Sequence, residues 1–364
     1  MLIDRVVVKN FKSLRDINLP LSNLTLLTGI NSSGKSSFIQ ALLLLKQNEE
    51  RLFFSKRKKL IKLNDRFVTL GKKQNILYEE EISSEDILIS LISGKNELNV
   101  KFNIDDLIIK SNIDELIDIN LFYDDFQYIS TNRIEPSNTY DISDEEVDRN
   151  LIGFRGEFTA HYLSKNRHKK LLIEKLQHKD ATTMRLLENV SLWLSEISSG
   201  VEVKATLYED LQSASLSYSY TYGGLTTSDY SPFNVGFGLT YSLPIIVAIL
   251  KAKRGDLIII ENPESHLHPS GQSKMAQLCA IASANGVQII VETHSDHFLN
   301  GLRVATKKGI ISSNQSQIYY FRKEENSIET IVDSLNIDEN GKINQDWPKG
   351  FFDEYENLLD ELLW

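Results

Sequence analysis

The order of apolar and polar residues along the chain predicts an α/β protein. Residues 2–28 alternate between the two kinds as β-strands do, and a stretch rich in glycine and serine then leads into an apolar helix at residues 38–46. Short β-like segments broken by Gly, Asn and Asp follow at residues 67–129, as is typical of an antiparallel meander. From residue 238 onward helices alternate with apolar strands, which indicates a parallel sheet covered on both faces.

Between these two parts the pattern becomes helical and then alternates again. Residues 161–199, including residues 169–177, carry apolar residues at helical spacing, and residues 201–222 alternate as strands do. A helical insertion therefore interrupts the predicted sheet. In the C-terminal half we expect helices at residues 239–253, 270–285 and 296–307 and strands at residues 256–260 and 287–291.

The net charge of −10 is concentrated near the C-terminal end of the chain. Residues 326–364 contain ten carboxylates against Lys342 and Lys349, so the rest of the chain carries a charge of only about −2. This nearly neutral body does not argue against a nucleic-acid partner. A basic run at residues 51–62 could contact phosphates, and a solvated loop is the alternative for it. Residues 165–170 form a second basic cluster, to which the sequence assigns no chemical role.

The composition favours a cytoplasmic protein that does not cross a membrane. The single cysteine, Cys279, cannot form an intramolecular disulfide, and residues 1–10 lack the features of a signal peptide. The apolar run at residues 239–250 is shorter than the roughly 20 residues that span a bilayer. Residues 351–363 have apolar positions at helical spacing with acids between them. We expect an amphipathic helix there that packs on the body, with partner binding as the alternative.

A phosphate-binding loop is predicted at residues 29–36, which read Gly-Ile-Asn-Ser-Ser-Gly-Lys-Ser and fit the pattern G-x-x-x-x-G-K-[ST]. The loop follows a predicted strand and opens a predicted helix, which favours a binding loop over a chance glycine turn. The two glycines allow successive amides to face phosphates, Lys35 would neutralise their charge, and the Ser36 hydroxyl can ligate Mg²⁺. The candidate nucleotide contacts are Gly29, Asn31, Ser32, Ser33, Gly34, Lys35, Ser36 and Ser37.

Polar residues follow two of the apolar strands in the C-terminal half. The strand ending at Ile260 is followed by Glu261, Asn262 and Glu264, and the next strand leads to Glu292 and His294. Because ligands collect at the carboxyl ends of parallel strands, we expect these side chains to meet at one site. There a carboxylate can hold Mg²⁺, another can orient the attacking water, and a histidine can contact the γ-phosphate.

Three sequence segments, GINSSGKSS, LIIIENPESHLHP and VETHSDH, resemble the ABC-type ATPases of the RecF, SMC and OLD (overcoming-lysogenisation-defect) group. Their counterparts there are the Walker A loop, the Walker B strand with its D-loop, and the histidine switch. The similarity extends to a bacterial family of standalone ATPases with a C-terminal domain of unknown function, through segments such as Trp347-Pro-Lys-Gly-Phe-Phe-Asp353. The resemblance implies a P-loop NTPase with an ABC-ATPase-like head, built on a mixed sheet with an antiparallel β subdomain and a helical insertion.

The resemblance also implies roles for individual residues. Lys35, Glu261, Glu264 and His294 would be the catalytic residues, with Ser36 and Glu261 at Mg²⁺ and His294 as the switch histidine. Gly236 and Gly238, at the start of the helix from residue 239, would act as a signature segment that caps ATP bound to a second subunit, and a tight turn before a core helix is the alternative.

The chain departs from the family pattern at the Walker B motif. It has Glu261-Asn262 where many relatives have Asp-Glu, so a neutral amide stands where the general base usually stands. Either Glu261 or Glu264 must then position the water, and hydrolysis is expected to be slow. The structural alternative for Glu264 is that it caps the helix after Pro269 or pairs with a basic neighbour.

Two further candidates remain open. His266, His268, His294 and His297 lie in one window of 32 residues and could bind Zn or Mn in a metal-dependent nuclease, although hydrogen-bonded structural histidines are the alternative. Arg133 follows a strand-like stretch and would contact nucleotide or a dimer partner, or form a surface salt bridge.

We therefore expect an ATPase that uses ATP and Mg²⁺ and dimerises head to tail. The resemblance implies a DNA-related output, in antiphage defence or genome maintenance, through a separately encoded effector such as a nuclease. A scaffold that binds ATP with little hydrolysis and a metal-dependent nuclease are the alternatives. The predicted segments are an N-terminal ATPase lobe at 1–66, a β-rich subdomain at 67–140, a helical insertion at 141–200, a C-terminal ATPase lobe at 201–325 and an acidic segment at 326–364.

Overall fold

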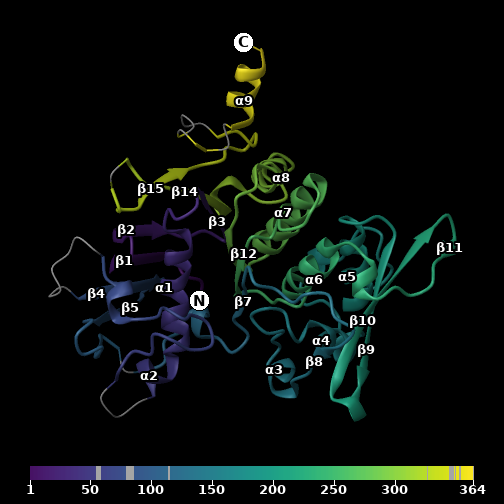
Figure 1. Cartoon of the computed structure of the whole chain (residues 1–364), viewed down its shortest axis with the longest axis horizontal. Helices are drawn as coiled ribbons and strands as arrows, with labels where there is room; N and C mark the ends of the chain where they lie inside the picture. The colour runs from purple at the N-terminus through teal and green to yellow at the C-terminus, as the bar shows by residue number, and fades with distance from the viewer. Residues whose placement is uncertain are drawn as a thin grey trace. The chain divides into compact units, whose positions relative to one another are not determined.

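The computed structural model describes residues 1–54, 59–78, 86–113, 115–325, 327–343, 348, 350–351 and 354–363 (Figure 1). The chain divides into two compact units. Unit 1 comprises Met1–Tyr123, Gln317–Asn336 and Ile343–Trp364, and unit 2 comprises Asp124–Ser316 and Ile337–Lys342. Both ends of the chain therefore belong to unit 1, whereas the predicted boundaries at residues 140 and 200 lie inside unit 2.

Unit 1 contains an antiparallel sheet with the strand order β2–β1–β4–β5–β6. Its strands alternate between buried and solvent-facing residues, as in β1, where Val6 and Val8 are buried and Lys9 is partly exposed. This alternation is the pattern that predicted strands at the N-terminus and a meander after residue 67. The strands are β1 (Arg5–Phe11), β2 (Leu14–Pro20), β4 (Ile87–Ser93), β5 (Asn96–Phe102) and β6 (Ile109–Ser111).

A second set of strands in unit 1, in the order β15–β14–β3, carries the phosphate-loop sequence. Strand β3 is buried from Leu24 to Thr28, and the apolar side of α1 packs nearby, with the Phe38 and Phe321 rings 6.3 Å apart. The elements are β3 (Leu24–Gly29), α1 (Lys35–Gln47), α2 (Glu49–Phe53), β14 (Ser316–Arg322), β15 (Ile331–Leu335) and α9 (Glu354–Leu363), with short 3-10 helices at Lys73–Ile76 and Asn120–Phe122.

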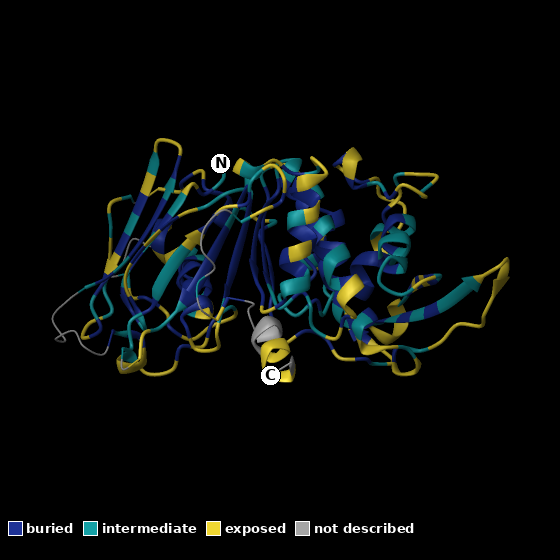
Figure 2. Cartoon of the chain, turned by 90° about the horizontal axis from the view of Figure 1, so that it is seen from above, coloured by how far each residue is buried: buried dark blue, intermediate teal, exposed yellow. Residues whose placement is uncertain are grey.

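Unit 2 contains three parallel strands in the order β13–β12–β7. All of β13 is buried, and β12 is buried up to Glu261, as expected of strands covered on both faces (Figure 2). The helices and strands expected here are confirmed within three residues at each end. The elements are β7 (Gln127–Ile129), α6 (Phe237–Leu250), β12 (Leu257–Glu261), α7 (Pro269–Ala284), β13 (Gln288–Glu292) and α8 (Asp296–Lys307).

The middle of the chain adds helices and an antiparallel sheet to unit 2. Strand β9 pairs with β10 over its full length, and the sheet continues in the order β11–β10–β8. The elements are β8 (Tyr140–Asp141), α3 (Asp144–Asp148), α4 (Thr159–Asn166), α5 (Leu186–Ser195), β9 (Val201–Tyr208), β10 (Ser213–Tyr222) and β11 (Leu225–Thr226), with 3-10 helices at Glu174–Leu176, Glu209–Leu211, Pro232–Asn234 and Ser313–Gln315.

The continuous helix predicted at residues 169–177 does not form, because only Glu174–Leu176 is helical, as a single 3-10 turn, and the residues before it are extended. Leu171 and Ile173 are buried while Leu172 is 57% exposed, so burial follows the period of two that an extended segment has. The segment pairs with residues farther along the chain through an antiparallel bridge between Lys170 and Arg185. The apolar residues of this short segment fit a helical period as well as the strand period of two. The pairing with Arg185 stabilises the extended form.

Two strand predictions at the end of the meander also need correction. Residues 120–122 form a 3-10 helix, in which Leu121 and Phe122 are both buried and strand alternation is lost. The next strand, β7, does not continue the antiparallel meander but pairs in parallel with β12. The chain therefore leaves the antiparallel sheet of unit 1 before it reaches β7.

The C-terminal helix forms as predicted, but its described apolar side chains are not packed on the body. In α9, Leu358 is 48%, Leu359 is 37% and Leu362 is 82% exposed. The prediction of a docked helix is therefore wrong for these residues. None of the helices in the described ranges has the length and apolar character that a bilayer-spanning segment needs.

Candidate nucleotide site

The predicted phosphate loop joins β3 directly to α1. Its backbone turns through positive φ angles at Gly29 (137°), Ser32 (61°) and Gly34 (108°). Gly34 is the N-cap of α1, and no side chain caps the helix there. A loop that turns its amides toward the start of a 13-residue helix favours an anion at that end, through the helix dipole and the N–H groups.

The lysine of the loop is buried within it. Lys35 is 3% exposed, and its Nζ donates hydrogen bonds to the carbonyl oxygens of Gly29 (3.0 Å) and Ile30 (2.9 Å). The neighbouring Ser36 is exposed in the first turn of α1. The loop thus holds an ammonium group beside the helix N-terminus, where phosphate oxygens can replace the carbonyl partners.

Both glycines of the motif are required for two reasons: their backbone has a positive φ, and neighbouring atoms leave no room for a side chain. A Cβ at Gly29 would lie 2.0 Å from the carbonyl oxygen of Phe321 in β14, which is far inside van der Waals contact. A Cβ at Gly34 would lie 2.4 Å from the Thr330 hydroxyl oxygen. The residues that press on the loop come from the C-terminal part of unit 1.

Thr330 is a loop contact that the sequence did not reveal. Its hydroxyl donates to the carbonyl oxygen of Ser33 (2.8 Å) and lies 2.8 Å from the Ser13 hydroxyl, and its amide donates to the Ser13 carbonyl oxygen (2.9 Å). Thr330 is 3% exposed. No pattern in the chain marks a threonine 297 residues from Ser33 as its partner.

In unit 2, Glu261 ends β12, and its carboxylate is fixed by the segment after β7. Oε2 accepts hydrogen bonds from the Thr131 amide (3.1 Å) and the Thr131 hydroxyl (3.0 Å), and the same hydroxyl lies 2.9 Å from Asn262 Oδ1. The Tyr128 hydroxyl also hydrogen-bonds Glu261, and burial raises the pKa of Tyr128, which keeps it a donor. Thr131 and Tyr128 therefore orient the candidate metal carboxylate, and sequence reasoning assigned neither of them this role.

Arg133 is a buried structural residue, so the prediction that it contacts nucleotide, a partner or a surface acid is wrong. It is 0% exposed, and its guanidinium donates to the backbone oxygens of Ser130 (3.2 Å), Glu261 (2.7 Å) and Asn262 (2.5 Å). Burial lowers the pKa of Arg133 to about 10, although Glu264 and other nearby groups oppose the shift. The guanidinium holds the chain at the end of β12, where Asn262 has a φ of 45°.

Glu264 is held by the segment that follows β13. Oε2 accepts from the Thr293 hydroxyl (2.7 Å), and Oε1 accepts from the His294 amide (2.9 Å). Glu264 neither caps α7, whose N-cap is His268, nor takes part in an ion pair that the described residues show. The predicted meeting of the two strand ends is therefore confirmed within unit 2, through a carboxylate and a backbone amide, while the His294 side chain is exposed.

The glycines of the signature-like segment differ in their surroundings. Gly236 is the N-cap of α6, and a Cβ there would meet nothing within 4 Å. A Cβ at Gly238 would lie 2.5 Å from the His266 carbonyl oxygen, so this glycine permits close packing of α6 on the loop after β12. The His266 ring lies 4.6 Å from the Tyr241 ring and 5.8 Å from the Phe237 ring, measured between centroids.

The histidines do not form a metal site. His268 caps α7 through Ser270, His266 lies among aromatic rings, and His297 is 3.7 Å from Asp296. Across the described residues, no group of three or more His, Cys, Asp or Glu side chains could hold a metal ion. This arrangement gives no support to a histidine-based nuclease.

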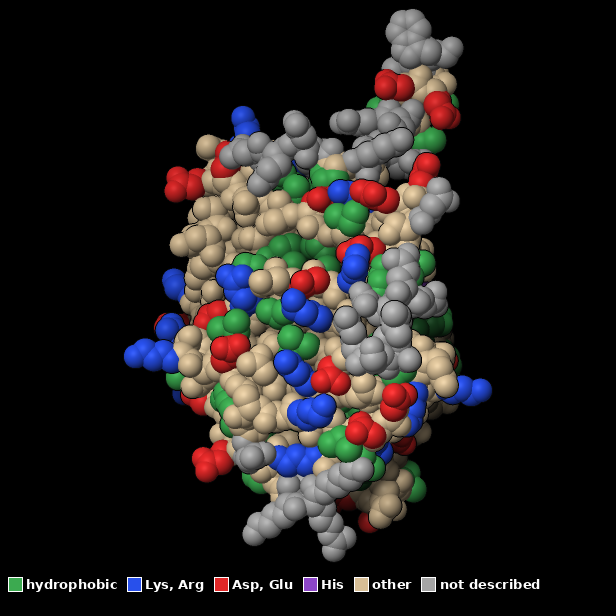
Figure 3. Space-filling model, turned by 90° about the vertical axis from the view of Figure 1, so that its left-hand side faces the viewer, with side chains coloured by type: hydrophobic (Ala, Val, Ile, Leu, Met, Phe, Trp, Pro, Cys, Tyr) green, Lys and Arg blue, Asp and Glu red, His purple; other side chains and the backbone are tan. Residues whose placement is uncertain are grey.

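The first basic run gives no continuous positive surface in its described part. Residues 55–58 of this run lie outside the described residues, and Lys62 pairs with Asp65 at 2.5 Å. On the side shown in Figure 3, Lys and Arg side chains are interspersed with Asp and Glu.

Each unit by itself carries groups that suit one part of a magnesium–nucleotide complex. Unit 1 supplies a loop of amides, the Lys35 ammonium and the Ser36 hydroxyl, which suit phosphate and Mg²⁺. Unit 2 supplies the oriented Glu261 carboxylate, which is the hard oxygen ligand that Mg²⁺ prefers. The roles of the individual residues toward ATP remain predictions.

Comparison with known proteins agrees with this fold. The chain is similar to the crystal structure of an SMC head bound to the C-winged helix domain of ScpA, with 13% identity, a TM-score of 0.53, and coverage of 93% of this chain and 99% of that one. It is also similar to a Pyrococcus furiosus structure, the Smc head domain with an extended coiled coil bound to the C-terminal domain of ScpA, with 13% identity, a TM-score of 0.51 and full coverage of both chains. No curated protein matches the chain.

Two family profiles match the sequence. The profile described as "AAA domain, putative AbiEii toxin, Type IV TA system" matches residues 24–300, which include the phosphate loop and both strand ends. A profile described as a protein of unknown function (DUF3696) matches residues 311–362, which include Phe321 and Thr330. The fold is that of SMC-head ABC-type ATPases, as the three motifs predicted. The chain belongs to the family of AAA domains of the AbiEii type and carries a C-terminal DUF3696 segment.

Proposed function

We propose that this protein binds ATP·Mg²⁺ and hydrolyses it slowly. We further propose that ATP binding controls whether two copies of the protein associate. The observation that carries the proposal is the phosphate loop, because its glycines, its buried Lys35 and its helix N-terminus are all arranged for a phosphate chain. The family and the SMC-head fold support a nucleotide-binding ATPase.

We assign Lys35 to the β- and γ-phosphates, Ser36 and Glu261 to Mg²⁺, and His294 to the γ-phosphate. When bound, Mg²⁺ would neutralise charge on the phosphate oxygens. The Glu261 carboxylate is pre-oriented by Thr131, so little side-chain entropy is lost when it engages the ion.

Glu264 is the residue we assign to the attacking water. Asn262 is a neutral amide and cannot take a proton, whereas each Glu264 oxygen accepts one hydrogen bond, from Thr293 or from His294, and retains a lone pair for water. Since Glu264 is tied to the His294 amide, a shift of the segment after β13 on γ-phosphate release would move Glu264 as well. This link couples the proposed base to the proposed switch.

Titration calorimetry and phosphate release test the proposal together. We expect Lys35→Ala to abolish both ATP binding and turnover. Glu264→Gln is expected to retain binding and to lower turnover at least 100-fold, as loss of a general base does. Glu174→Gln, which removes a carboxylate elsewhere in unit 2, is the matched control and is expected to behave like the unmodified chain. ATP binding that survives Lys35→Ala would contradict the assignment of the loop.

An ATP-gated scaffold with little hydrolysis is the second candidate, and Asn262 favours it because the usual base position is neutral. It predicts that Glu264→Gln has no effect on an already negligible turnover, while ATP still changes the mass in solution. A rise in mass with ATP·Mg²⁺ in Glu264→Gln, and none in Lys35→Ala, would support the switch. No change of mass with ATP in any variant would contradict it.

We further propose a DNA-related output, in defence or genome maintenance, exerted in the cytoplasm through a separately encoded effector. The family description, which names a toxin–antitoxin system, supports a role of this kind. The test is the affinity for short labelled DNA with and without ATP·Mg²⁺. An affinity that is the same in both conditions, and equally weak in both, would contradict DNA as the object of the switch.

A further inference from the structure

A hollow of about 530 Å³ in unit 1 is lined by lysines, and no Asp or Glu is among the described residues that line it. Its walls come from residues 61–64, residues 71–74 and Leu107. The charged residues of the lining are Lys62, Lys72 and Lys73. The proposed nucleotide contacts include none of them. We call this feature the lysine hollow.

Hydrogen bonds fix the walls of the lysine hollow. Asn64 closes the loop between the first two segments, because its Nδ2 donates to the Gly71 carbonyl oxygen (3.1 Å) and its Oδ1 accepts from the Gly71 amide (2.7 Å). On another side, the Leu107 carbonyl oxygen accepts from the Ile61 amide (2.9 Å). Lys72 follows Gly71 directly in the chain. The hollow is therefore formed before any ligand binds.

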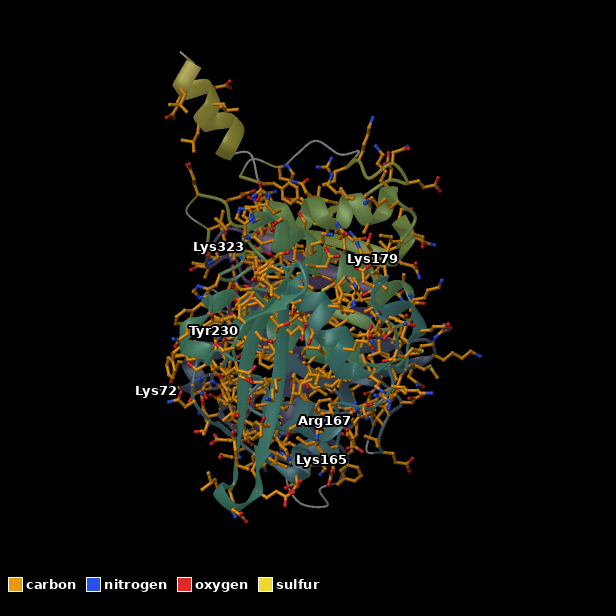
Figure 4. All side chains as sticks on the ribbon, turned by 90° about the vertical axis from the view of Figure 1, so that its right-hand side faces the viewer. Lys72, Lys165, Arg167, Lys179, Tyr230 and Lys323 are labelled. Carbon is orange, nitrogen blue, oxygen red and sulfur yellow. The ribbon has the colours of Figure 1, made fainter. Side chains whose placement is uncertain are left out.

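The three lysines differ in how far their charge is neutralised. Lys62 pairs with Asp65 at 2.5 Å, so its charge is compensated. Lys73 donates to the backbone carbonyl oxygen of Asp105 (2.7 Å), which satisfies one proton but leaves the positive charge. Lys72 is exposed (Figure 4), and its ammonium group has no ion pair or hydrogen bond with any residue that the structure describes. The charges of Lys72 and Lys73 thus remain available to an anion.

The chain around the lysine hollow is basic. Residues 51–73 contain nine Lys and Arg and a single acid, Asp65, in a chain with a net charge of −10. Residues 55–58 lie outside the described residues and are not part of the hollow. When Asp105 and Asp106 are counted as well, residues 59–74 and 103–107 carry five Lys and Arg against three Asp. The local charge therefore selects an anionic ligand.

We propose that the lysine hollow binds the phosphate backbone of a nucleic acid, and this inference rests on the DNA-related output proposed above. Lysine is a flexible point charge, which suits phosphate oxygens. The uncharged lining consists of aliphatic side chains, glycine and side-chain amides. It offers no aromatic ring on which a base can stack and no carboxylate for sugar hydroxyls, so a free nucleotide is the poorer fit. Contacts of this kind bind the backbone and do not read the sequence.

The test is the affinity of the full-length chain for a short labelled DNA duplex as a function of salt, with and without ATP·Mg²⁺. We expect Lys72→Gln with Lys73→Gln to lower the affinity at least tenfold at low salt. The slope of log affinity against log salt is expected to become shallower by about 1.8, since each contacted phosphate contributes about 0.9. Lys307→Gln with Lys308→Gln, at another adjacent pair of exposed lysines, is the matched control and is expected to leave the slope unchanged.

A single substitution separates loss of binding from loss of structure. Lys72→Gln leaves the hydrogen bond of Lys73 in place, and we expect it to reduce the slope by about 0.9 while the midpoint of urea unfolding stays the same. Slopes that are unchanged in the hollow variants, or reduced equally in the control, would overturn the proposal. Absence of DNA binding by the unmodified chain in both conditions would overturn it too.

Inorganic tripolyphosphate represents a free anion as the competing occupant. Calorimetry in a Lys35→Ala background measures its binding without the phosphate loop. Tripolyphosphate binding that Lys72→Gln with Lys73→Gln abolishes, in a chain whose DNA affinity these substitutions leave unchanged, would overturn the assignment to nucleic acid.

The lysine hollow and the proposed function fail in different ways. The lysines lie outside the proposed nucleotide contacts, so ATP binding and turnover are expected to be unchanged in their variants. DNA binding that depends on ATP but not on Lys72 and Lys73 would overturn the lysine hollow alone. DNA binding that depends on these lysines but not on ATP would contradict the switch and leave the lysine hollow in place.

Discussion

The phosphate loop of unit 1 and the carboxylate edge of unit 2 are held in place by different means. The loop is shaped by its backbone, because Gly29 and Gly34 have positive φ and touch β14 and Thr330 directly. The carboxylate edge is shaped by side chains, because the buried Arg133 guanidinium holds the backbone at Glu261 and Asn262. Backbone constraints can be tested by adding a methyl group, whereas side-chain constraints need a change of charge or hydrogen bonding.

This difference explains why the phosphate loop was predicted more completely than the carboxylate edge. Backbone requirements are encoded locally, as glycines at fixed spacing, so residues 29–36 identify the loop on their own. Side-chain supports come from distant segments. The partner of Glu261, Thr131, is 130 residues away in the chain. The predictions below test whether the phosphate loop and the carboxylate edge depend on these separate supports.

Arg133→Met is expected to have the largest effect and to act on unit 2. It leaves the backbone oxygens of Ser130, Glu261 and Asn262 without their buried donor, and we expect a loss of about 4 kcal/mol in the free energy of unfolding. Urea unfolding measures the loss. The exposed Arg167→Met is the control, with an expected change within about 0.5 kcal/mol. Equal stability of the two variants would show that the edge does not depend on Arg133.

Gly29→Ala tests the backbone support of unit 1. The added methyl group would lie 2.0 Å from the Phe321 carbonyl oxygen at a φ of 137°, so we expect ATP binding to be lost and stability to fall by about 3 kcal/mol. Gly236→Ala is the matched control for stability, since its methyl group meets nothing within 4 Å and its φ is −61°. Calorimetry with ATP and urea unfolding distinguish the two. Normal ATP binding by Gly29→Ala would mean that the loop tolerates the displacement.

Asp256→Asn removes an unfavourable buried charge just before β12. Burial raises the pKa of Asp256 to about 6, and its Oδ1 has no hydrogen-bond partner within the described residues. An acid whose pKa is raised on folding binds more protons in the folded state, so its contribution to stability is present below pH 4 and is lost as the pH rises to about 6. We expect Asp256→Asn to be more stable than the unmodified chain by about 2 kcal/mol at pH 8.

A comparison at pH 3 is the internal check on Asp256. At pH 3 the carboxyl is protonated in the folded state and mostly protonated in the unfolded state, where its pKa is the ordinary 3.8, so the difference between the two chains is expected to fall to a small fraction of its value at pH 8. Denaturation at the two pH values measures it, with the exposed Asp210→Asn as a control that should show no such change. A difference that is the same at both values would contradict the assignment to Asp256.

Thr330→Val is expected to have the smallest effect on stability, about 1 kcal/mol, because it removes a single buried hydroxyl with similar volume. The effect on ATP affinity is expected to be about tenfold, since the hydroxyl fixes Ser33 in the loop. Thr330→Ser keeps the hydroxyl and is expected to retain most of the affinity. Equal affinities for the valine and serine variants would show that the hydroxyl does not position the loop.

The sequence was sufficient for most of the fold and for the strand, loop and helix at residues 24–47. The phosphate loop, β12, β13 and helices α6 to α8 were predicted because apolar periodicity and glycine spacing are local signals. Arg133 was misassigned, because nothing next to it in the chain shows that it is buried under Glu261 and Asn262. The continuous helix predicted at residues 169–177 does not form, because a short apolar run fits the helical period and the strand period equally well. The docking of α9 was misjudged because an amphipathic pattern does not say where the partner surface is.

The contacts of Phe321 and Thr330 with the phosphate loop have a consequence for folding of the protein during its synthesis on the ribosome. The loop sequence leaves the exit tunnel early, but the segments that press on Gly29 and Gly34 are synthesised only after residue 316. At roughly 5 to 20 residues per second, the interval lasts about 15 to 60 seconds. During translation the nascent chain therefore carries a loop without its supports. We expect competence for nucleotide to arise only after the segment that contains Phe321 and Thr330 has been made.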